Sequence, residues 1–285
     1  MGDVQSAIER AAFGEHGAQW SIAVVDLDTG ASLGERDPDA CLSTASVGKL
    51  LALIDLAERV GSGEADLRTV VARTEADRVA DSGLWQHLAI EELPLADVAM
   101  LIGTVSDNLA TNVLLRHLGL GSVQHRAGLL GLSTVQLHDR VRDERTPDDP
   151  PRLSSGSARE LTGLMRRLRS DGPGLVLDWL RPGTDLSLVA SAFGLDPLAH
   201  VLVDRGLRVI NKTGTNRGVR ADVGIVEGPA RGLVYAVLVN WTEPATPDDR
   251  SRDLVLDAMR AIGSALRATV AGGGVRDESS GCATS

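Results

Sequence analysis

Apolar runs along the chain predict five β-strands, two near its start and three near its end. The first two, 20–27 (WSIAVVDL) and 31–34, are separated by an Asp-Thr-Gly turn, which predicts a hairpin. The late runs are 207–215, 219–227 and 232–241. Short turns separate these three runs, so they should form an antiparallel meander. The two groups can share one sheet only if the chain returns to it, so we expect a discontinuous fold.

Between the two groups of strands the apolar pattern is helical. Residues 46–61 are apolar nearly all round, which predicts a helix buried inside the protein. The capping box 157–160 (SARE) predicts the start of another helix. The remaining predicted helices span 4–13, 94–103, 108–118 and 251–270. The first and last of these can cover one face of the sheet.

We therefore expect an α+β fold with a five-stranded antiparallel sheet, flanking terminal helices and an inserted all-α lobe. The predicted division assigns 1–40 and 206–270 to the α/β lobe, 41–205 to the all-α lobe, and 271–285 to a disordered tail. Residues 139–156 hold five acids, four arginines and three prolines, with little to build an element from. Such a stretch is either functional or a solvated excursion at the surface.

Composition narrows the possible partners. The chain has 285 residues, 43% hydrophobic and 24% charged, which is typical of a globular protein. Its formal charge of −10 disfavours nucleic acid and anionic membranes, and no apolar run reaches the ~18 residues of a membrane span. The two distant cysteines and six histidines show no ligand spacing, so we expect no metal and no cofactor. We expect instead that the chain binds a small-molecule substrate and that it is a monomer.

The N-terminal residues lack the charged start and apolar core of a secretory signal. As the chain stands we expect a cytoplasmic protein, or an exported one if a leader has been removed.

Lysine is almost absent. Of 29 basic residues only Lys49 and Lys212 are lysines, so the chain uses arginine wherever a generic surface cation is needed. Burial can lower the pKa of an ammonium enough for it to act as a base, whereas a guanidinium stays protonated. The two lysines are therefore candidates for chemistry.

Ser46-Val47-Gly48-Lys49 places a hydroxyl and an amine on one face at the start of the buried helix. The helix N-terminus offers N–H groups to a developing oxyanion, and the amine can accept the serine proton. The alternative is that Ser46 is a plain N-cap and that the Lys49 side chain reaches solvent.

Two further motifs are ambiguous when taken singly. Ser106-Asp107-Asn108 begins a predicted helix and alone is an ordinary cap, with Asn112 one turn later facing the same way. Lys212-Thr213-Gly214-Thr215 ends a predicted strand. Its glycine would let a substrate lie close to the backbone, although an exposed edge lysine could instead discourage aggregation.

S-x-x-K, S-D-N and K-T-G in this order form a known signature, and over residues 4–270 the chain strongly resembles the class A β-lactamases and the related penicillin-binding proteins. The resemblance implies a two-lobed fold. It implies that Ser46 is the acylated nucleophile, that Lys49 accepts its proton, and that Ser106 delivers a proton to the departing nitrogen. It further implies that Lys212 holds Ser106 and the substrate carboxylate, and that Asn108 positions the substrate amide.

The same resemblance implies an oxyanion hole formed by the backbone N–H groups of Ser46 and Thr215. It places Thr213, Thr215 and Arg220 near the substrate carboxylate, with Gly214 in the substrate-binding strand.

The chain departs from the class A pattern in one loop. Class A enzymes carry a glutamate there that activates the water for deacylation. The only glutamate here is Glu144, which fits only if the loop is rearranged, because counting forward from S-D-N puts the position nearer Val141 or Arg142. Without an effective base, a long-lived acyl-enzyme is expected.

The sequence leaves three hypotheses for the function. The first is a serine β-lactamase-type hydrolase that opens a β-lactam amide through an acyl-serine intermediate. The second is a related esterase, amidase or peptidase acting on a small acyl substrate, with slow or absent deacylation of β-lactams. The third is a binding module without turnover, which the intact motifs disfavour.

Overall fold

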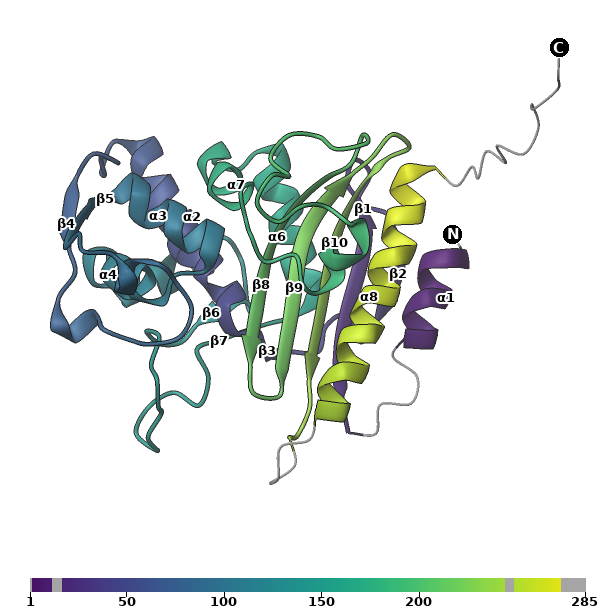
Figure 1. Cartoon of the computed structure of the whole chain (residues 1–285), viewed down its shortest axis with the longest axis horizontal. Helices are drawn as coiled ribbons and strands as arrows, with labels where there is room; N and C mark the ends of the chain where they lie inside the picture. The colour runs from purple at the N-terminus through teal and green to yellow at the C-terminus, as the bar shows by residue number, and fades with distance from the viewer. Residues whose placement is uncertain (1, 12–16, 244–248, 273–285) are drawn as a thin grey trace, which may run out of the picture.

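A five-stranded antiparallel sheet joins the early and late parts of the sequence (Figure 1). The computed structural model describes residues 2–11, 17–243 and 249–272. The strands, in sheet order, are β2 (Ser32–Arg36), β1 (Gln19–Asp26), β10 (Gly232–Asn240), β9 (Val219–Glu227) and β8 (Arg208–Asn216). Because β1 pairs with β10 along its whole length, the predicted return of the chain to one sheet is confirmed.

Helices cover both faces of this sheet. α1 (Gly2–Ala11) and α8 (Asp249–Ala271) lie together on one face, as predicted for the terminal helices. α6 (Ala158–Ser170) packs on the other face against β1, β9 and β10. Along β10 the apolar side chains alternate between the two cores. Tyr235 packs with the core beneath α8, while Ala236 packs with the core on the α6 side.

The chain between β2 and β8, which includes the predicted helical lobe, carries the other helices, and part of it lies to the left of the sheet in Figure 1. Its other helices are α2 (Lys49–Ser62), α3 (Leu95–Val105), α4 (Asn108–Leu118), α5 (Leu120–Leu129) and α7 (Gly174–Leu180). The predicted burial of the α2 helix is correct, since every residue from Lys49 to Ala57 is buried. One apolar cluster runs from this lobe to Ile210 and Val223 in the sheet.

Several short elements interrupt the region predicted to be helical. Two small sheets contain β3 (Leu42–Ser43), β7 (Ser154–Gly156) and β6 (Gln136–Leu137), and β4 (Val70–Ala72) and β5 (Glu92–Pro94). The 3-10 turns are η1 (Ala45–Gly48), η2 (Glu75–Asp77), η3 (Trp85–His87) and η4 (Val189–Phe193). Strands of two or three residues are too short to show a period of two, so the sequence pattern does not reveal them.

The predicted helix at 46–61 begins only at Lys49, because Ser46 lies on η1. The turn is set by tertiary packing: a Cβ on Gly48 would lie 2.3 Å from the Cβ of Ser154, so glycine lets η1 pass close to β7. The tail predicted at 271–285 lies outside the described residues apart from its first two, and the division of the lobes at residues 40 and 205 stays a prediction. Among the described helices, none is both long and apolar enough to cross a membrane.

Candidate active site

Ser46 lies on a turn that is fixed by contacts from distant parts of the chain. Asn240 on β10 accepts a hydrogen bond from the backbone N–H of Ser43 at 2.8 Å and donates to its C=O at 3.0 Å. The Ser154 hydroxyl donates to the carbonyl of Ala45 at 2.6 Å. These contacts hold the backbone on the N-terminal side of Ser46.

Strand β8 passes close to the same turn at Gly214. A Cβ at this position would lie 2.1 Å from the carbonyl oxygen of Thr44 and 3.1 Å from the backbone nitrogen of Ser46. A side chain would therefore push the strand away from the turn. Glycine lets the backbone of β8 lie directly beside Ser46, with Thr215 following on the cavity wall.

Two buried amines converge on the hydroxyl of Ser106. Lys49, with none of its surface exposed, has its Nζ 3.3 Å from Ser106 Oγ, 2.5 Å from the Ser106 carbonyl oxygen and 2.6 Å from Asn108 Oδ1. Lys212, which is 3% exposed, donates to Ser106 Oγ at 3.0 Å and to the Thr213 carbonyl at 2.8 Å. The alternative that the Lys49 side chain reaches solvent is therefore wrong, and its burial agrees with the favoured interpretation.

The surroundings of the two amines favour different protonation states. Burial, reinforced by the charge of Lys212, holds the pKa of Lys49 well below its ordinary value. Burial also lowers the pKa of Lys212, to about 8, although the carboxylates of Asp185 and Asp222 act in the opposite direction. An uncharged Lys49 has two N–H bonds for its two carbonyl-type acceptors, which leaves its lone pair to accept a proton from a hydroxyl.

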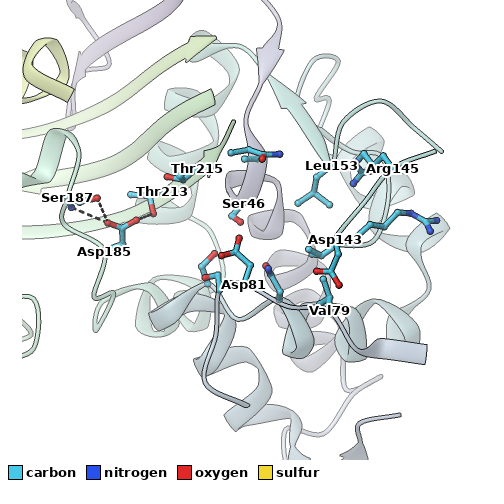
Figure 2. A pocket seen from close by; sticks show the side chains of 17 residues that line it. Ser46, Val79, Asp81, Asp143, Arg145, Leu153, Asp185, Ser187, Thr213 and Thr215 are labelled. Atoms are coloured by element: carbon cyan, nitrogen blue, oxygen red, sulfur yellow. Dashed lines mark hydrogen bonds between the residues drawn. The ribbon is translucent and has the colours of Figure 1, made fainter. Parts of the chain in front are cut away.

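A cavity of about 650 Å³ lies in front of this cluster (Figure 2). Ser46, Ser106 and Asn108 line it, and Ser46 lies between the sheet side and the loop side in Figure 2. The residues on the sheet side are Asp185, Ser187, Thr213, Thr215 and Asn216. The residues on the loop side are Val79, Asp81, Ser82, Val141, Arg142, Asp143, Arg145 and Leu153.

Backbone strain concentrates at this cavity. In the described ranges, five residues other than glycine have a positive φ, and three of them, Ala45, Asp81 and Ser106, line the cavity. Their φ values are 45°, 72° and 56°. Such conformations are costly for side-chain-bearing residues and occur most often at functional sites. Their clustering supports a functional role for the cavity.

Comparison with known proteins identifies the family of this chain. A model of the β-lactamase enzyme family matches residues 3–270. The chain belongs to this β-lactamase family. The resemblance seen in the sequence is confirmed. Among similar proteins, the β-lactamase regulatory protein BlaB of Streptomyces cacaoi is 28% identical over 84% of this chain and 89% of its own length. β-Lactamase ROB-1 of Haemophilus influenzae is 26% identical over 87% and 80%.

Solved structures of a β-lactamase and of PBP-A have the same fold as this chain. A β-lactamase from Sphaerobacter thermophilus has a TM-score of 0.77 and 23% identity, with 94% of this chain and 97% of that one covered. A mutant of PBP-A in an acyl-enzyme complex with penicillin G has a TM-score of 0.76 and 22% identity, covering 93% and 97%. The predicted fold class is therefore correct.

Two asparagines of α4 attach the loop side of the cavity to this helix. Asn108 donates to the Ala80 carbonyl at 3.1 Å while its oxygen accepts from Lys49. Asn112 accepts from the N–H of Val141 at 2.9 Å and donates to its C=O at 3.0 Å. Val141 is thereby held at the cavity wall, facing the same space as Ser46.

Asp107, the middle residue of S-D-N, has a structural role in this protein. Its carboxylate accepts from the N–H of Ala110 at 2.8 Å and so caps α4. It also accepts from the N–H groups of Leu84 and Trp85, at 2.7 and 2.8 Å. The motif is thus both a helix cap and a part of the cavity.

The structure brings most of the predicted site residues together, but not Glu144 or Arg220. Among the described residues Lys49 forms its hydrogen bonds with Ser106 and Asn108, and none with Ser46. Glu144 is exposed and does not line the cavity, whereas Val141, Arg142, Asp143 and Arg145 of the same loop do.

Arg220 lines a neighbouring cavity. Asp81, Thr215 and Asn216 line both this cavity and the first one. Its guanidinium donates to the carbonyls of Asn216 and Val219 and lies 5.5 Å from the ring centre of Trp241.

Asp185 is a cavity residue that sequence reasoning missed. Thr213 Oγ1 donates to it at 2.5 Å, and Ser187 Oγ donates at 2.6 Å. Burial raises the pKa of Asp185, but the hydrogen bonds from Ser187 and Thr213 outweigh burial and lower it overall. A single aspartate after a Pro-Gly turn carries no local signal of such a role. Within the described residues, no three His, Cys, Asp or Glu side chains are grouped to hold a metal ion.

Proposed function

We propose that this chain is a serine acyl enzyme that opens β-lactam amides on Ser46 and releases the acyl group slowly. The observation that carries the proposal is the convergence of Lys49 and Lys212 on the hydroxyl of Ser106, beside the cavity that Ser46 lines. Buried amines are costly to maintain, and two of them around one hydroxyl are difficult to explain by stability alone.

In the proposed acylation, Ser46 Oγ forms a bond to the lactam carbonyl carbon while Lys49 takes the serine proton. The low pKa of Lys49 supports this role, because the amine must be neutral before it accepts a proton. The C–N bond then breaks, and Ser106 gives its proton to the departing nitrogen. Ser106 recovers a proton from Lys49, so the pair returns to its starting state.

The binding roles follow from the elements around Ser46. The backbone N–H groups of Ser46 and Thr215 would hold the developing oxyanion, and Asn108 would hold the substrate amide. Because the Thr213 hydroxyl already donates its hydrogen bond to Asp185, Lys212 and Thr215 are the better donors for a substrate carboxylate. Arg220 would act from the neighbouring cavity, as a more distant positive charge.

Slow release of the acyl group is supported by Val141, the side chain at the cavity wall where a base would be needed. Deacylation needs a base that activates water near the ester. Val141, which Asn112 holds at this wall, has no titratable group, and Glu144 is outside the cavity. The acyl-serine would therefore persist, as it does in a penicillin-binding protein. Small esters, amides or peptides could enter through the same acylation steps.

A second candidate is a β-lactamase with efficient turnover. The carboxylates of Asp81 and Asp143 in the cavity favour it, since either could activate water if the acyl group lay close enough.

Incubation with a chromogenic cephalosporin, followed over time by intact-mass measurement, separates the candidates. We expect one burst of colour and a persistent adduct that maps to Ser46 and is absent from Ser46→Ala. Continuous turnover would favour the second candidate. No colour and no adduct, in a protein that melts cooperatively, would contradict both.

A further inference from the structure

We infer that the loop side of the cavity selects substrates whose acyl substituent carries a positive charge. This inference rests on the proposed function and assigns its substrate class. The carboxylates of Asp81 and Asp143 carry it, because both line the cavity and neither forms an ion pair among the described residues. A β-lactam bearing an ammonium group on its acyl side chain fits this requirement.

Both residues are exposed at the cavity, and the carboxylate of Asp143 is held by a backbone contact. Asp143 accepts a hydrogen bond from the N–H of Ala80 at 2.8 Å, which joins its loop to the segment that carries Asp81. Asp81 has a left-handed backbone with φ at 72°. Its charge also acts on the reactive cluster, since it opposes the lowering of the Lys49 pKa that burial causes.

Two arginines on the same side of the cavity do not cancel these charges. Arg142 donates to Asp139 at 2.7 Å and is paired with Asp149 at 3.0 Å. Arg145 donates to Asp139 at 2.5 Å and to the Pro150 carbonyl at 2.9 Å. Their guanidinium groups are therefore neutralised by carboxylates that do not line the cavity.

The position of the two carboxylates relative to Ser46 points to the acyl substituent. Lys212 and Thr215, the proposed carboxylate donors, belong to β8 on the sheet side. Figure 2 shows Asp143 and Val79 on the opposite side of Ser46 from Thr213 and Thr215, and Asp81, two residues after Val79 on the loop side, below Ser46. A substrate anchored by its carboxylate on the sheet side extends its acyl group towards Asp81 and Asp143.

Three penicillins with the same core provide a matched test. Benzylpenicillin is uncharged at the α-carbon of its acyl group, ampicillin carries an amine there and carbenicillin a carboxylate. Second-order acylation rate constants are measured by stopped-flow and intact mass, at low salt and a pH where the amine is mostly protonated. We expect ampicillin to react about tenfold faster than carbenicillin or more, with benzylpenicillin between them. The ratio should decline towards one as salt screens the charges.

Substitutions identify the responsible charges. Asp81→Asn and Asp143→Asn should each lower the ratio, and the double variant should bring it to about twofold or less. Asparagine tolerates the left-handed backbone at position 81. Glu144→Gln removes a charge from the same loop outside the cavity, so the ratio should be kept in this control.

The possible failures are distinguishable. A parental ratio near one at low salt, or a ratio that survives in the double variant, would overturn the inference while acylation itself persists. If none of the three penicillins acylates the folded protein, the proposed function fails and the inference with it.

Discussion

Lys49 and Lys212 share one hydrogen-bonding partner, the hydroxyl of Ser106, at 3.3 and 3.0 Å. Two ammonium groups held this close repel each other, so the cluster is most stable when one amine is neutral. Lys49 is the better candidate for the neutral form, because burial and the charge of Lys212 both lower its pKa, while Asp185 and Asp222 support the charge of Lys212.

A bell-shaped pH dependence of acylation follows from this division. At low pH Lys49 is protonated and cannot act as the base. At high pH Lys212, whose pKa is about 8, loses its positive charge and binds a substrate carboxylate less tightly. We expect the alkaline limb to have its midpoint near pH 8. Stopped-flow acylation from pH 5 to 10 gives the profile. In Lys212→Arg the cation persists, so the alkaline limb should disappear. A variant that keeps the same limb would show that another group titrates there.

Replacing Lys49 by arginine should abolish acylation. A guanidinium stays protonated and cannot take the proton of Ser46, so we expect the acylation rate to fall about a thousandfold or more. Intact mass after incubation with benzylpenicillin measures the adduct. Because Lys49 is wholly buried, the thermal transition of the variant must be recorded alongside, with Lys49→Gln as a smaller uncharged alternative. Rapid adduct formation by a folded Lys49→Arg protein would refute the role of Lys49 as base.

A carboxylate introduced at position 141 should shorten the lifetime of the acyl-enzyme. Asn112 fixes the backbone of Val141 on both sides, so Val141→Glu would present its side chain to the space in front of Ser46. We expect deacylation to accelerate about a hundredfold, as is usual for an added general base. Val141→Gln has nearly the same shape without the basic group and should keep the slow rate. Equal lifetimes for the Glu and Gln variants would indicate that deacylation is limited elsewhere.

Asp222 should make the protein less stable as the pH rises towards 8. It is a wholly buried residue of β9 in the main sheet, where burial raises its pKa to about 7, while Asn211 and Tyr235 donate hydrogen bonds to it. Since the folded value lies above the ordinary 3.8, the folded protein binds more protons between the two values. This contribution is fully present below pH 3.8 and is lost as the pH rises through about 7.

Melting temperatures between pH 5 and 8 measure this effect. We expect the parent to lose about 5 °C more over this range than Asp222→Asn, whose amide oxygen can still accept from Asn211 and Tyr235. The comparison cancels the titration of the two lysines, which both proteins share. Parallel declines in the two proteins would show that other groups cause the pH dependence.

The sequence predicted the five strands of the main sheet and most of the helices, because each carries a sustained apolar period, but it missed α5 and α7. It also singled out Lys49 and Lys212, since their scarcity among many arginines marks positions where an amine is required. The start of α2 was harder to predict. Ser46 looks like an N-cap, yet contacts of Asn240 and Ser154 with the turn override the local propensity.

The roles that the sequence missed, within the site and outside it, are those that depend on pairing across the chain. Glu160 follows Ser157 as in a capping box, but its carboxylate accepts from the N–H groups of Ser133 and Val135 instead. Asp185 likewise gains a role only when β8 brings Thr213 to it. No local pattern distinguishes such residues from ordinary polar loop positions.

The turn that carries Ser46 has a consequence for the order of events during synthesis. Its anchors, Ser154, Gly214 and Asn240, are translated about a hundred to two hundred residues after the serine itself. A ribosome-bound chain that ends before β10 thus holds the nucleophile without the framework that orients it. Chains with many distant contacts fold slowly, so reactivity towards a penicillin should arise only after β10 has been synthesised and paired.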